Sequence, residues 1–446
     1  MAQIFPFRAY RYDPARFDPA QVLTQPYDKI TPEMQDRYYS LHPDNLVQLE
    51  KGRSFPDDSP ENNVYTRAAR SLQGWIDRRV LVRDPAPGIY VYSQDYQLPH
   101  SSERLLRKGF IALGRIEDYS AGVVFRHEQT LAGPKADRLE LLRHTRAHSG
   151  QLFMLYDDPA RQAHALLEQA SHVPAPVKLR DEYGVVHRLW PVLDPQTIDL
   201  FRLALADKKL VIADGHHRYE TALAYRNECR AAGRNAPDAP QEKVMMTFFN
   251  IRSEGLTILP THRVVSGLGA FDFVRLRTQL DSVFEVQSFA FSGNSDRAAR
   301  FAEFRRGLHT PDHHRHAIGL YAPGAFHLFV LRPDADLDSL LPDVSPAQRR
   351  LDVVLLHGLL LEKGLGITAD DVRKEKNISY EREMDAAMAA VDAGQAQLCC
   401  LLNPIRIQQM MKVALAGEVL PQKSTDFFPK LLSGITIYRL EGYSLK

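Results

Sequence analysis

The sequence predicts a mixed α/β protein, with an N-terminal α/β core followed by a second α+β domain. Residues 210–213 form a short apolar run, and the Asp214-Gly215 turn connects it directly to a helical stretch over 216–232. Residues 89–98 alternate between apolar and polar side chains, as expected of a half-buried strand. Strand-like and helical segments alternate elsewhere without one consistent βαβ period, which favours mixed sheets over a regular parallel array.

The N-terminal half contains the remaining elements of the core in turn. Thr31, Pro32 and Glu33 combine an N-cap residue, a first-turn proline and an early acid, so a helix begins there. Residues 51–63 are polar and predict a solvated loop. The later segments are predicted as helices over 64–82, 133–148, 159–170 and 194–207, and as strands over 108–116, 152–156 and 185–193.

The C-terminal half is also mixed. We expect strands over 244–250 and 397–402, a hairpin over 317–331, and helices over 345–363 and 404–416. Residues 233–241 are rich in Pro, Ala and Asn, which indicates a loop and a domain boundary. The expected domains are therefore residues 1–240 and 241–446.

Charge and cysteine content exclude several classes of protein. The chain has 446 residues, with 56 Lys and Arg against 55 Asp and Glu, so a general nucleic-acid binder or a polybasic membrane-surface protein is not expected. Of its three cysteines, Cys399 and Cys400 are adjacent, and no CxxC pair indicates zinc. The N-terminal residues lack the apolar stretch of a secretory signal, so we expect a cytoplasmic protein that does not span a membrane.

The turn at residues 214–218 has the features of a phosphate-binding site. Gly215 lets the backbone approach a ligand, and the first turn of the following helix offers unpaired N–H groups and the positive end of its dipole. His216, His217 and Arg218 add further donors. Asp214 is alternatively a plain N-cap beside ordinary polar residues. A metal site formed by His217 and Glu220 is another alternative, but it lacks a defined third ligand.

This stretch, together with four others, resembles a known family. Residues 212–223 (IADGHHRYETAL) are similar to the hallmark of the domain of unknown function 1015 family. Further blocks that match the family are QPYD at 25–28, HEQT at 127–130 with PKADR at 134–138, LPTHR at 259–263, and PQKST at 421–425 with FPKL at 428–431. Residues 372–378 depart from the family pattern, and we assign no role to them.

The DGHHR element is also similar to the phosphate-binding turn of the ParB/sulfiredoxin superfamily, which includes free-serine kinases that use ADP or ATP. This resemblance implies a ParB/sulfiredoxin-like nucleotide-binding core, with a β-rich insertion at about 85–190. It implies that residues 241–446 form an α+β domain that contributes the PQKST segment to the site. It further implies a nucleotide-dependent phosphotransferase that uses Mg²⁺ with ADP or ATP, acts on a small metabolite and has serine and O-phosphoserine as its leading pair.

The remaining blocks then supply groups for phosphoryl transfer. The candidate cations that would contact the transferred phosphoryl group are Lys135, Arg138 and Lys423. The candidate hydroxyl donors are Ser424 and Thr425. The alternatives are a solvated basic face for Lys135 and Arg138 and an exposed loop lysine for Lys423.

A base is also needed, and both Asp28 and Glu128 qualify, with His217 as a third candidate catalytic group. Two other functions stay open at this point. One is a ParB-like nucleotide-binding regulatory protein. The other is a phosphatase-like metal-dependent hydrolase that uses His216, His217 and Glu220.

Overall fold

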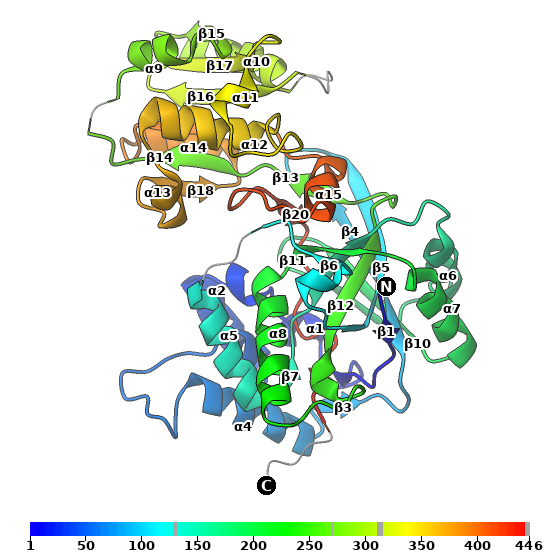
Figure 1. Ribbon diagram of the computed structural model, residues 1–446. Helices are drawn as coiled ribbons and strands as arrows, with labels where there is room; N and C mark the ends of the chain where they lie inside the picture. The colour runs from blue at the N-terminus through cyan, green and yellow to red at the C-terminus, as the bar shows by residue number, and fades with distance from the viewer. Residues whose placement is uncertain (129–131, 270, 310–314, 442–446) are drawn as a thin grey trace. The chain divides into compact units, whose positions relative to one another are not determined.

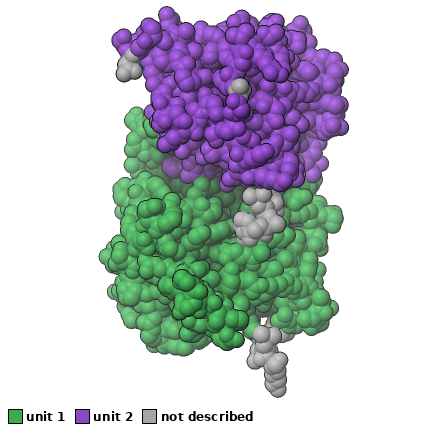
Figure 2. All heavy atoms as spheres, turned by 90° about the vertical axis from the view of Figure 1, so that its left-hand side faces the viewer, with its two compact units in different colours: residues 1–126, 130–257, 429–446 green, residues 127–129, 258–428 purple. Residues whose placement is uncertain are grey.

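The computed structural model describes residues 1–128, 132–269, 271–309 and 315–441. They form a mixed α/β fold with several sheets, as the sequence predicts (Figure 1). The chain divides into two compact units, which Figure 2 distinguishes by colour. Unit 1 comprises residues 1–126, 130–257 and 429–446, and unit 2 comprises 127–129 and 258–428. Among the described helices, none has the length and apolar character needed to cross a membrane.

Unit 1 is built on a nine-stranded mixed sheet. Eight strands follow the order β6-β11-β8-β12-β5-β4-β10-β9, and β1 also pairs with β5. The strands β11 and β6, and likewise β12 and β8, are parallel, whereas β11 is antiparallel to β8. The strands are β1 (Ile4–Phe5), β4 (Ile89–Gln97), β5 (Arg104–Arg115), β6 (Val124–Phe125), β8 (Leu152–Tyr156), β9 (Val177–Arg180), β10 (Val186–Val192), β11 (Leu210–Asp214) and β12 (Lys243–Asn250).

Helices pack around this sheet, and two further pairs of short strands complete the unit. Figure 1 shows α5 alongside α8, with α6 and α7 as a second pair elsewhere on the sheet. The short pairs are β2 (Tyr10–Tyr12) with β3 (Leu81–Arg83), and β7 (Ala147–His148) with β21 (Tyr438–Arg439). The helices are α1 (Pro19–Val22), α2 (Pro32–Leu41), α3 (Val47–Glu50), α4 (Val64–Asp77), α5 (Ala132–Thr145), α6 (Gln162–Ala170), α7 (Pro195–Leu205) and α8 (His216–Ala231).

The core of unit 1 joins the sheet to α7 and α8. Phe110 of β5, Phe248 of β12 and Phe201 of α7 are fully buried against one another, with ring centroids 4.8–5.1 Å apart. On α8, Tyr219 and Ala222 are buried in the same cluster. The apolar face of α8 therefore packs on the core of the sheet. The N-terminus of α8, at the end of β11, makes polar contacts instead.

Unit 2 has its own six-stranded sheet, in the order β15-β17-β16-β19-β14-β18. These strands are β14 (His262–Val265), β15 (Phe284–Ala290), β16 (Ala317–Ala322), β17 (Ala325–Leu331), β18 (Ile378–Glu381) and β19 (Leu398–Leu401), while β13 (Thr257–Leu259) pairs with β20 (Asp426–Phe428). The helices are α9 (Phe273–Leu280), α10 (Asn294–Leu308), α11 (Leu337–Leu340), α12 (Asp352–Leu355) with a π-helical continuation over Leu356–Gly364, α13 (Ala369–Arg373), α14 (Met384–Asp392) and α15 (Ile407–Leu415). Phe304, Phe326 and Cys399 belong to its separate apolar core.

The division into units differs from the expected boundary at about residue 240. Residues 233–241 do form a connection, but it leads from α8 into β12, which pairs with β5 and β8 inside the first sheet. Loop composition marks such a connection without showing which sheet the next strand joins. Similarly, the strands β4, β5, β8 and β10 of the expected insertion at 85–190 are members of the sheet that also contains β11.

Candidate functional site

The DGHHR element lies where β11 passes into α8. The ladder between β11 and β8 shifts register between Ile212 and Asp214, so a bulge ends the strand. Gly215 follows with φ of +92°, in the left-handed region that favours glycine, and α8 begins at His216. A Cβ atom at Gly215 would lie 3.0 Å from Leu152 and 3.4 Å from Nε of Arg218. The glycine therefore provides both the turn and the space for the arginine.

The Arg218 guanidinium is the most constrained cation of this element. Its Nη1 donates to the carbonyl oxygen of Gln151, and Nη2 lies 3.9 Å from Oδ2 of Asp214. Its Nε is buried and has no hydrogen-bond partner within the described part of the chain. Burial would lower the pKa of Arg218, but Asp214, Asp28, Tyr27 and Glu50 outweigh it and raise that pKa. The charge is thus secured while one donor remains available to a ligand.

Asp214 is surrounded by positive charge. Nζ of Lys430 lies 3.4 Å from its Oδ2. Burial alone would raise the pKa of Asp214, but Lys430, Arg218, Lys29 and His216 hold it below its ordinary value. Asp214 is therefore ionised at neutral pH, and it keeps the cations around the turn in place.

The PYD block packs onto the same element. Tyr27, Asp28 and Lys29 form a single 3-10 turn, Tyr27–Lys29, with Asp28 exposed. The Arg138 guanidinium of α5 stacks over the Tyr27 ring at 4.4 Å. Burial raises the pKa of Tyr27 to about 12, so its hydroxyl stays neutral. The structure thus brings Asp28 and Arg138 to the neighbourhood of Arg218.

Glu50 is a carboxylate that the sequence analysis did not single out. It ends α3, is 3% exposed, and its Oε1 accepts a hydrogen bond from Ser149 Oγ at 2.8 Å. Its backbone carbonyl accepts from Nη1 of Arg138 at 2.9 Å. Its burial distinguishes it from the many exposed carboxylates, and burial cannot be read from a single sequence.

Three polar groups converge beside Gly150. The point where a Cβ atom of Gly150 would lie is 3.1 Å from Nη1 of Arg218, 3.2 Å from Oε1 of Glu50 and 3.4 Å from Oγ of Ser433. Ser433 Oγ is buried and has no hydrogen-bond partner among the described residues. A cation, a carboxylate and a hydroxyl therefore lie close together where Gly150 has no side chain.

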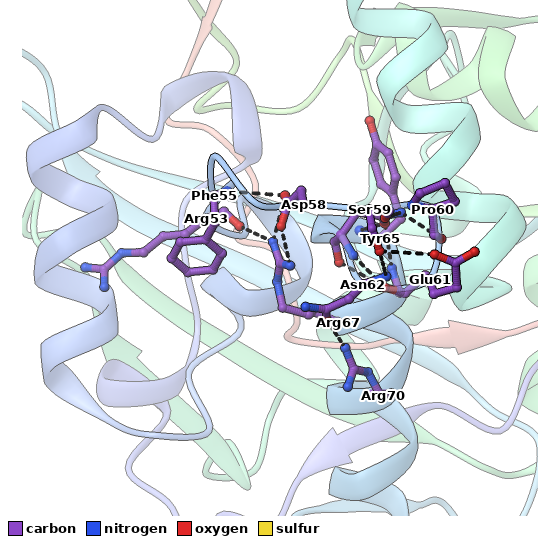
Figure 3. A network of polar contacts seen from close by, with 12 residues as sticks. Arg53, Phe55, Asp58, Ser59, Pro60, Glu61, Asn62, Tyr65, Arg67 and Arg70 are labelled. Atoms are coloured by element: carbon purple, nitrogen blue, oxygen red, sulfur yellow. Dashed lines mark hydrogen bonds and ion pairs between the residues drawn. The ribbon is translucent and has the colours of Figure 1, made fainter.

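The loop after Glu50 is held firmly, as the close-up in Figure 3 shows. Arg67 of α4 donates to both carboxylate oxygens of Asp58, at 2.6 and 3.0 Å, and to the carbonyl of Arg53 at 2.8 Å. Asn63 caps α4 by accepting from the backbone N–H groups of Tyr65 and Thr66. The Tyr65 hydroxyl then donates to Asp137 of α5, at 3.0 Å. These bonds tie the loop that follows α3 to α4, and α4 to the helix that carries Arg138.

The C-terminal segment completes unit 1. Side chains of the sheet hold its carbonyl groups: Arg107 donates to Pro429, Gln94 to Lys430 at 2.8 Å, and Gln151 to Leu432 at 3.1 Å. This anchoring places Lys430 at Asp214. Lys430 belongs to the FPKL block, and the sequence alone assigns it no role.

Lys135 lies on α5 and makes a different contact. Its Nζ lies 3.2 Å from Oε2 of Glu220, and Nη1 of Arg126 lies 3.4 Å from Oε1 of the same residue. Glu220 is thus engaged by cations. No group of three His, Cys, Asp or Glu that could hold a metal occurs within the described ranges. The arrangement does not favour the metal-site reading of His216, His217 and Glu220.

The other expected site residues gather in unit 2. The backbone N–H of Lys423, which has a left-handed φ of +57°, donates to Oε1 of Glu128 at 2.8 Å. Nε2 of His127 lies 2.7 Å from Oγ1 of Thr425, and the Ser424 hydroxyl donates to the carbonyl of Pro421. The HEQT and PQKST blocks therefore pack together. Gln129 and Thr130 lie outside the described residues.

The expected residues thus fall into two groups. Unit 1 contains Asp28, Lys135, Arg138, Asp214, Gly215, His216, His217 and Arg218, and unit 2 contains Glu128, Lys423, Ser424 and Thr425. The joining of both groups in one active site stays a prediction.

Comparison with family models decides the relationship of the chain. The model of the family described as protein of unknown function (DUF1015) matches residues 4–354. The chain belongs to this family. The match covers the DGHHR, PYD, HEQT and LPTHR blocks, and the resemblance predicted from those blocks is confirmed. No curated protein matches the chain.

Solved structures show distant likenesses. A conserved hypothetical protein from Pyrococcus furiosus is 12% identical, with a TM-score of 0.33 over 71% of this chain and 92% of that one. A free serine kinase in complex with AMP is 11% identical, with a TM-score of 0.34 over 70% and 88%. SbnI with a C-terminal truncation, from Staphylococcus aureus, is 10% identical, with a TM-score of 0.34 over 72% and 85%. At these TM-scores, the likeness carries no argument about the chemistry of the site.

Proposed function

We propose that the DGHHR site of unit 1 binds the phosphates of a nucleotide and transfers a phosphoryl group between it and a small hydroxylated metabolite. Serine and O-phosphoserine are the leading pair. The observation that carries the proposal is Arg218, a partly buried guanidinium beside the N-terminus of α8, whose Nε is buried and has no hydrogen-bond partner among the described residues. A phosphate oxygen is a suitable acceptor for such a donor.

The charges around Arg218 suit phosphoryl transfer. Lys430 and Lys29 are near enough to Asp214 to hold its pKa down, so they supply positive charge on the same side of the turn. Phosphoryl transfer needs cations on the equatorial oxygens of the moving group, and it needs little covalent chemistry from the protein. Arg218 and Lys430 would meet the phosphates, while Asp214 keeps both oriented.

Glu50 is the carboxylate best placed to orient the nucleophile. Its Oε1 and Nη1 of Arg218 both lie next to Gly150, so the carboxylate is close to the guanidinium that we assign to phosphate binding. Asp28, the exposed acid of the PYD turn, is the alternative in unit 1. Glu128 already accepts the N–H of Lys423 in unit 2.

Mg²⁺ would accompany the nucleotide. Because the described residues contain no cluster of three metal-binding side chains, the phosphates themselves would supply most of the ligands, as is common for Mg²⁺. The exposed carboxylate of Asp28 could join them. The ion would neutralise charge on the phosphate oxygens, and the protein residues would hold the phosphates.

We further place this activity in the cytoplasm. The three cysteines, Cys229, Cys399 and Cys400, are all buried and free. Free thiols are typical of a reducing compartment.

The proposal is tested by ³¹P NMR with ADP or ATP and serine, run in both directions. We expect phosphoserine formation or consumption by the wild type and its loss in Arg218→Ala. The control is Arg202→Ala, which removes an exposed arginine of α7 that pairs only locally with Asp199. Equal turnover in wild type and Arg218→Ala, or no turnover with any nucleotide, would contradict the proposal.

A further inference from the structure

Unit 2 contains a cavity of about 490 Å³ whose lining, within the described residues, includes three arginines and one carboxylate. This volume is within the range of small-molecule sites. The polar lining includes Arg263, Arg315, His316, Asp352, Arg406 and Gln409. All of them belong to unit 2, so the cavity uses no residue of the DGHHR turn.

Arg263 is the most deeply placed of the three arginines. It is 1% exposed, and it donates to the carbonyl of Thr261, to the carbonyls of Gln422 and Lys423 at 3.2 and 3.1 Å, and to His357 at 3.3 Å. None of these partners carries a negative charge. Burial lowers the pKa of Arg263 to about 10, so the guanidinium remains charged at neutral pH.

The lining contains two further arginines, Arg315 and Arg406. Arg315 donates to the carbonyl oxygen of Gly307 at 2.8 Å, another neutral partner. Asp352 is the one carboxylate among the lining residues of the described chain, and Nδ1 of His316 lies 2.9 Å from it. Arg263 and Arg315 therefore carry charge that their hydrogen-bond partners do not neutralise, and the carboxylate of Asp352 already has a partner. Arg406 also precedes α15, whose dipole adds positive potential at its N-terminus.

A second arginine-rich hollow, in unit 1, shows the contrast. It is lined by Arg53, Arg67 and Arg70 among others, and part of it lies in the view of Figure 3. There Arg67 is paired with Asp58, and Arg53 with Asp36, each at 2.6 Å. Local carboxylates balance those cations, whereas the neutral partners of Arg263 and Arg315 leave their charge for a ligand.

We propose that the cavity of unit 2 binds a small oxyanionic metabolite, one that carries phosphate or carboxylate groups, through Arg263, Arg315 and Arg406. Guanidinium groups bind both kinds of oxyanion through paired hydrogen bonds. The amide of Gln409 and the hydroxyl of Thr261 in the lining would bind neutral polar groups of the same ligand. The lining includes Ser424 of the PQKST block, but it contains none of the unit 1 residues to which we assign phosphoryl transfer.

Isothermal titration calorimetry at constant ionic strength tests the inference. The probes are inorganic pyrophosphate and citrate, with glycerol as the uncharged comparison. The proteins are wild type, Arg315→Gln, Arg406→Gln, and Arg306→Gln as a control that removes an exposed arginine of α10 outside the lining. Each is also prepared in an Arg218→Ala background, which separates this site from the one in unit 1.

We expect at least one probe to bind in the Arg218→Ala background. Arg315→Gln and Arg406→Gln should each weaken that binding by about tenfold or more, as the loss of a charge-assisted hydrogen bond implies, and Arg306→Gln should not. Pyrophosphate binding alone indicates a phosphorylated ligand, and citrate binding alone indicates a carboxylate. Binding of neither probe, or binding lost with Arg218→Ala and unaffected by Arg315→Gln and Arg406→Gln, overturns the inference whatever the outcome for phosphoryl transfer.

Discussion

Nζ of Lys430, in the C-terminal segment, lies 3.4 Å from Oδ2 of Asp214, at the end of β11. Nη2 of Arg218 lies 3.9 Å from the same carboxylate oxygen. Asp214 is thus the anion around which the cations of unit 1 are arranged. A phosphate bound next to Lys430 and Arg218 would compete with Asp214 for both cations. Variants that change the charge or the packing around Asp214 should therefore change phosphate binding.

Replacing Lys430 by Met removes the charge and keeps much of the apolar stem. Nucleotide affinity should fall by about tenfold, because a contact with a charged group contributes roughly 1.5 kcal/mol. Titration of ADP and ATP measures the change, with Lys412→Met, on an exposed position of α15, as the control. Unchanged affinity in Lys430→Met would show that this lysine does not contact the phosphates.

Gly215→Ala and Gly233→Ala form a matched pair. Both glycines have positive φ, +92° and +76°, so each alanine should cost about 1 kcal/mol of folding free energy. A Cβ at Gly215 would also press on Leu152 and the Arg218 guanidinium, whereas nothing lies within 4 Å of one at Gly233. Thermal unfolding should therefore shift in both variants, and nucleotide binding should weaken only in Gly215→Ala. Similar binding in the two would argue against a role for the turn.

The polar groups beside Gly150 are tested by adding a methyl group between them or by removing the carboxylate charge. Gly150→Ala puts a methyl group among Arg218, Glu50 and Ser433, and Glu50→Gln keeps the shape but removes the carboxylate. Glu50→Gln should lower the turnover number about a hundredfold with little change in nucleotide affinity, as expected of a group that orients the nucleophile. Gly150→Ala also presses on Arg218, so it should lower both the turnover number and nucleotide affinity. Asp28→Asn and Glu128→Gln are the comparisons. A larger loss of turnover in either of them than in Glu50→Gln would transfer the base role to that residue.

Unit 2 should lose stability in mild acid through His262. Burial, with Arg263 and His309, lowers the pKa of His262 to about 4, and its Nδ1 accepts the N–H of Leu402 at 3.2 Å. An unfolded histidine has a pKa of about 6.5, so below that pH the unfolded chain binds a proton that the folded chain excludes. The neutral ring thus contributes stability that is complete above pH 6.5 and lost as the pH falls towards 4, by at most about 3 kcal/mol.

The measurement is the thermal unfolding midpoint of wild type, His262→Gln and the exposed-site control His172→Gln between pH 7.5 and 4.5. Glutamine keeps an acceptor but does not titrate in this range. The difference between wild type and His262→Gln should shrink as the pH falls. Parallel curves for these two proteins would contradict the assignment.

Local signals in the sequence were sufficient for the turn that carries Arg218. The apolar run at 210–213, the Asp-Gly pair and the helical stretch predicted a strand, a turn and a helix, and the structure has β11 (Leu210–Asp214) and α8 (His216–Ala231) there. These features depend on neighbouring residues, through propensity, the left-handed conformation of glycine and the helix dipole. The family blocks also identified the family correctly.

Contacts between distant segments were decided only by the tertiary structure. Lys430 meets Asp214 because Gln94, Arg107 and Gln151 hold the carbonyls of the C-terminal segment, and no local pattern encodes that route. The burial of Glu50 and its position opposite Arg218 are of the same kind. The sequence by itself determined the strand, the turn and the helix around Gly215, because short-range physics builds them. The partners around that turn depend on long-range strand pairing and burial, which only the folded chain specifies.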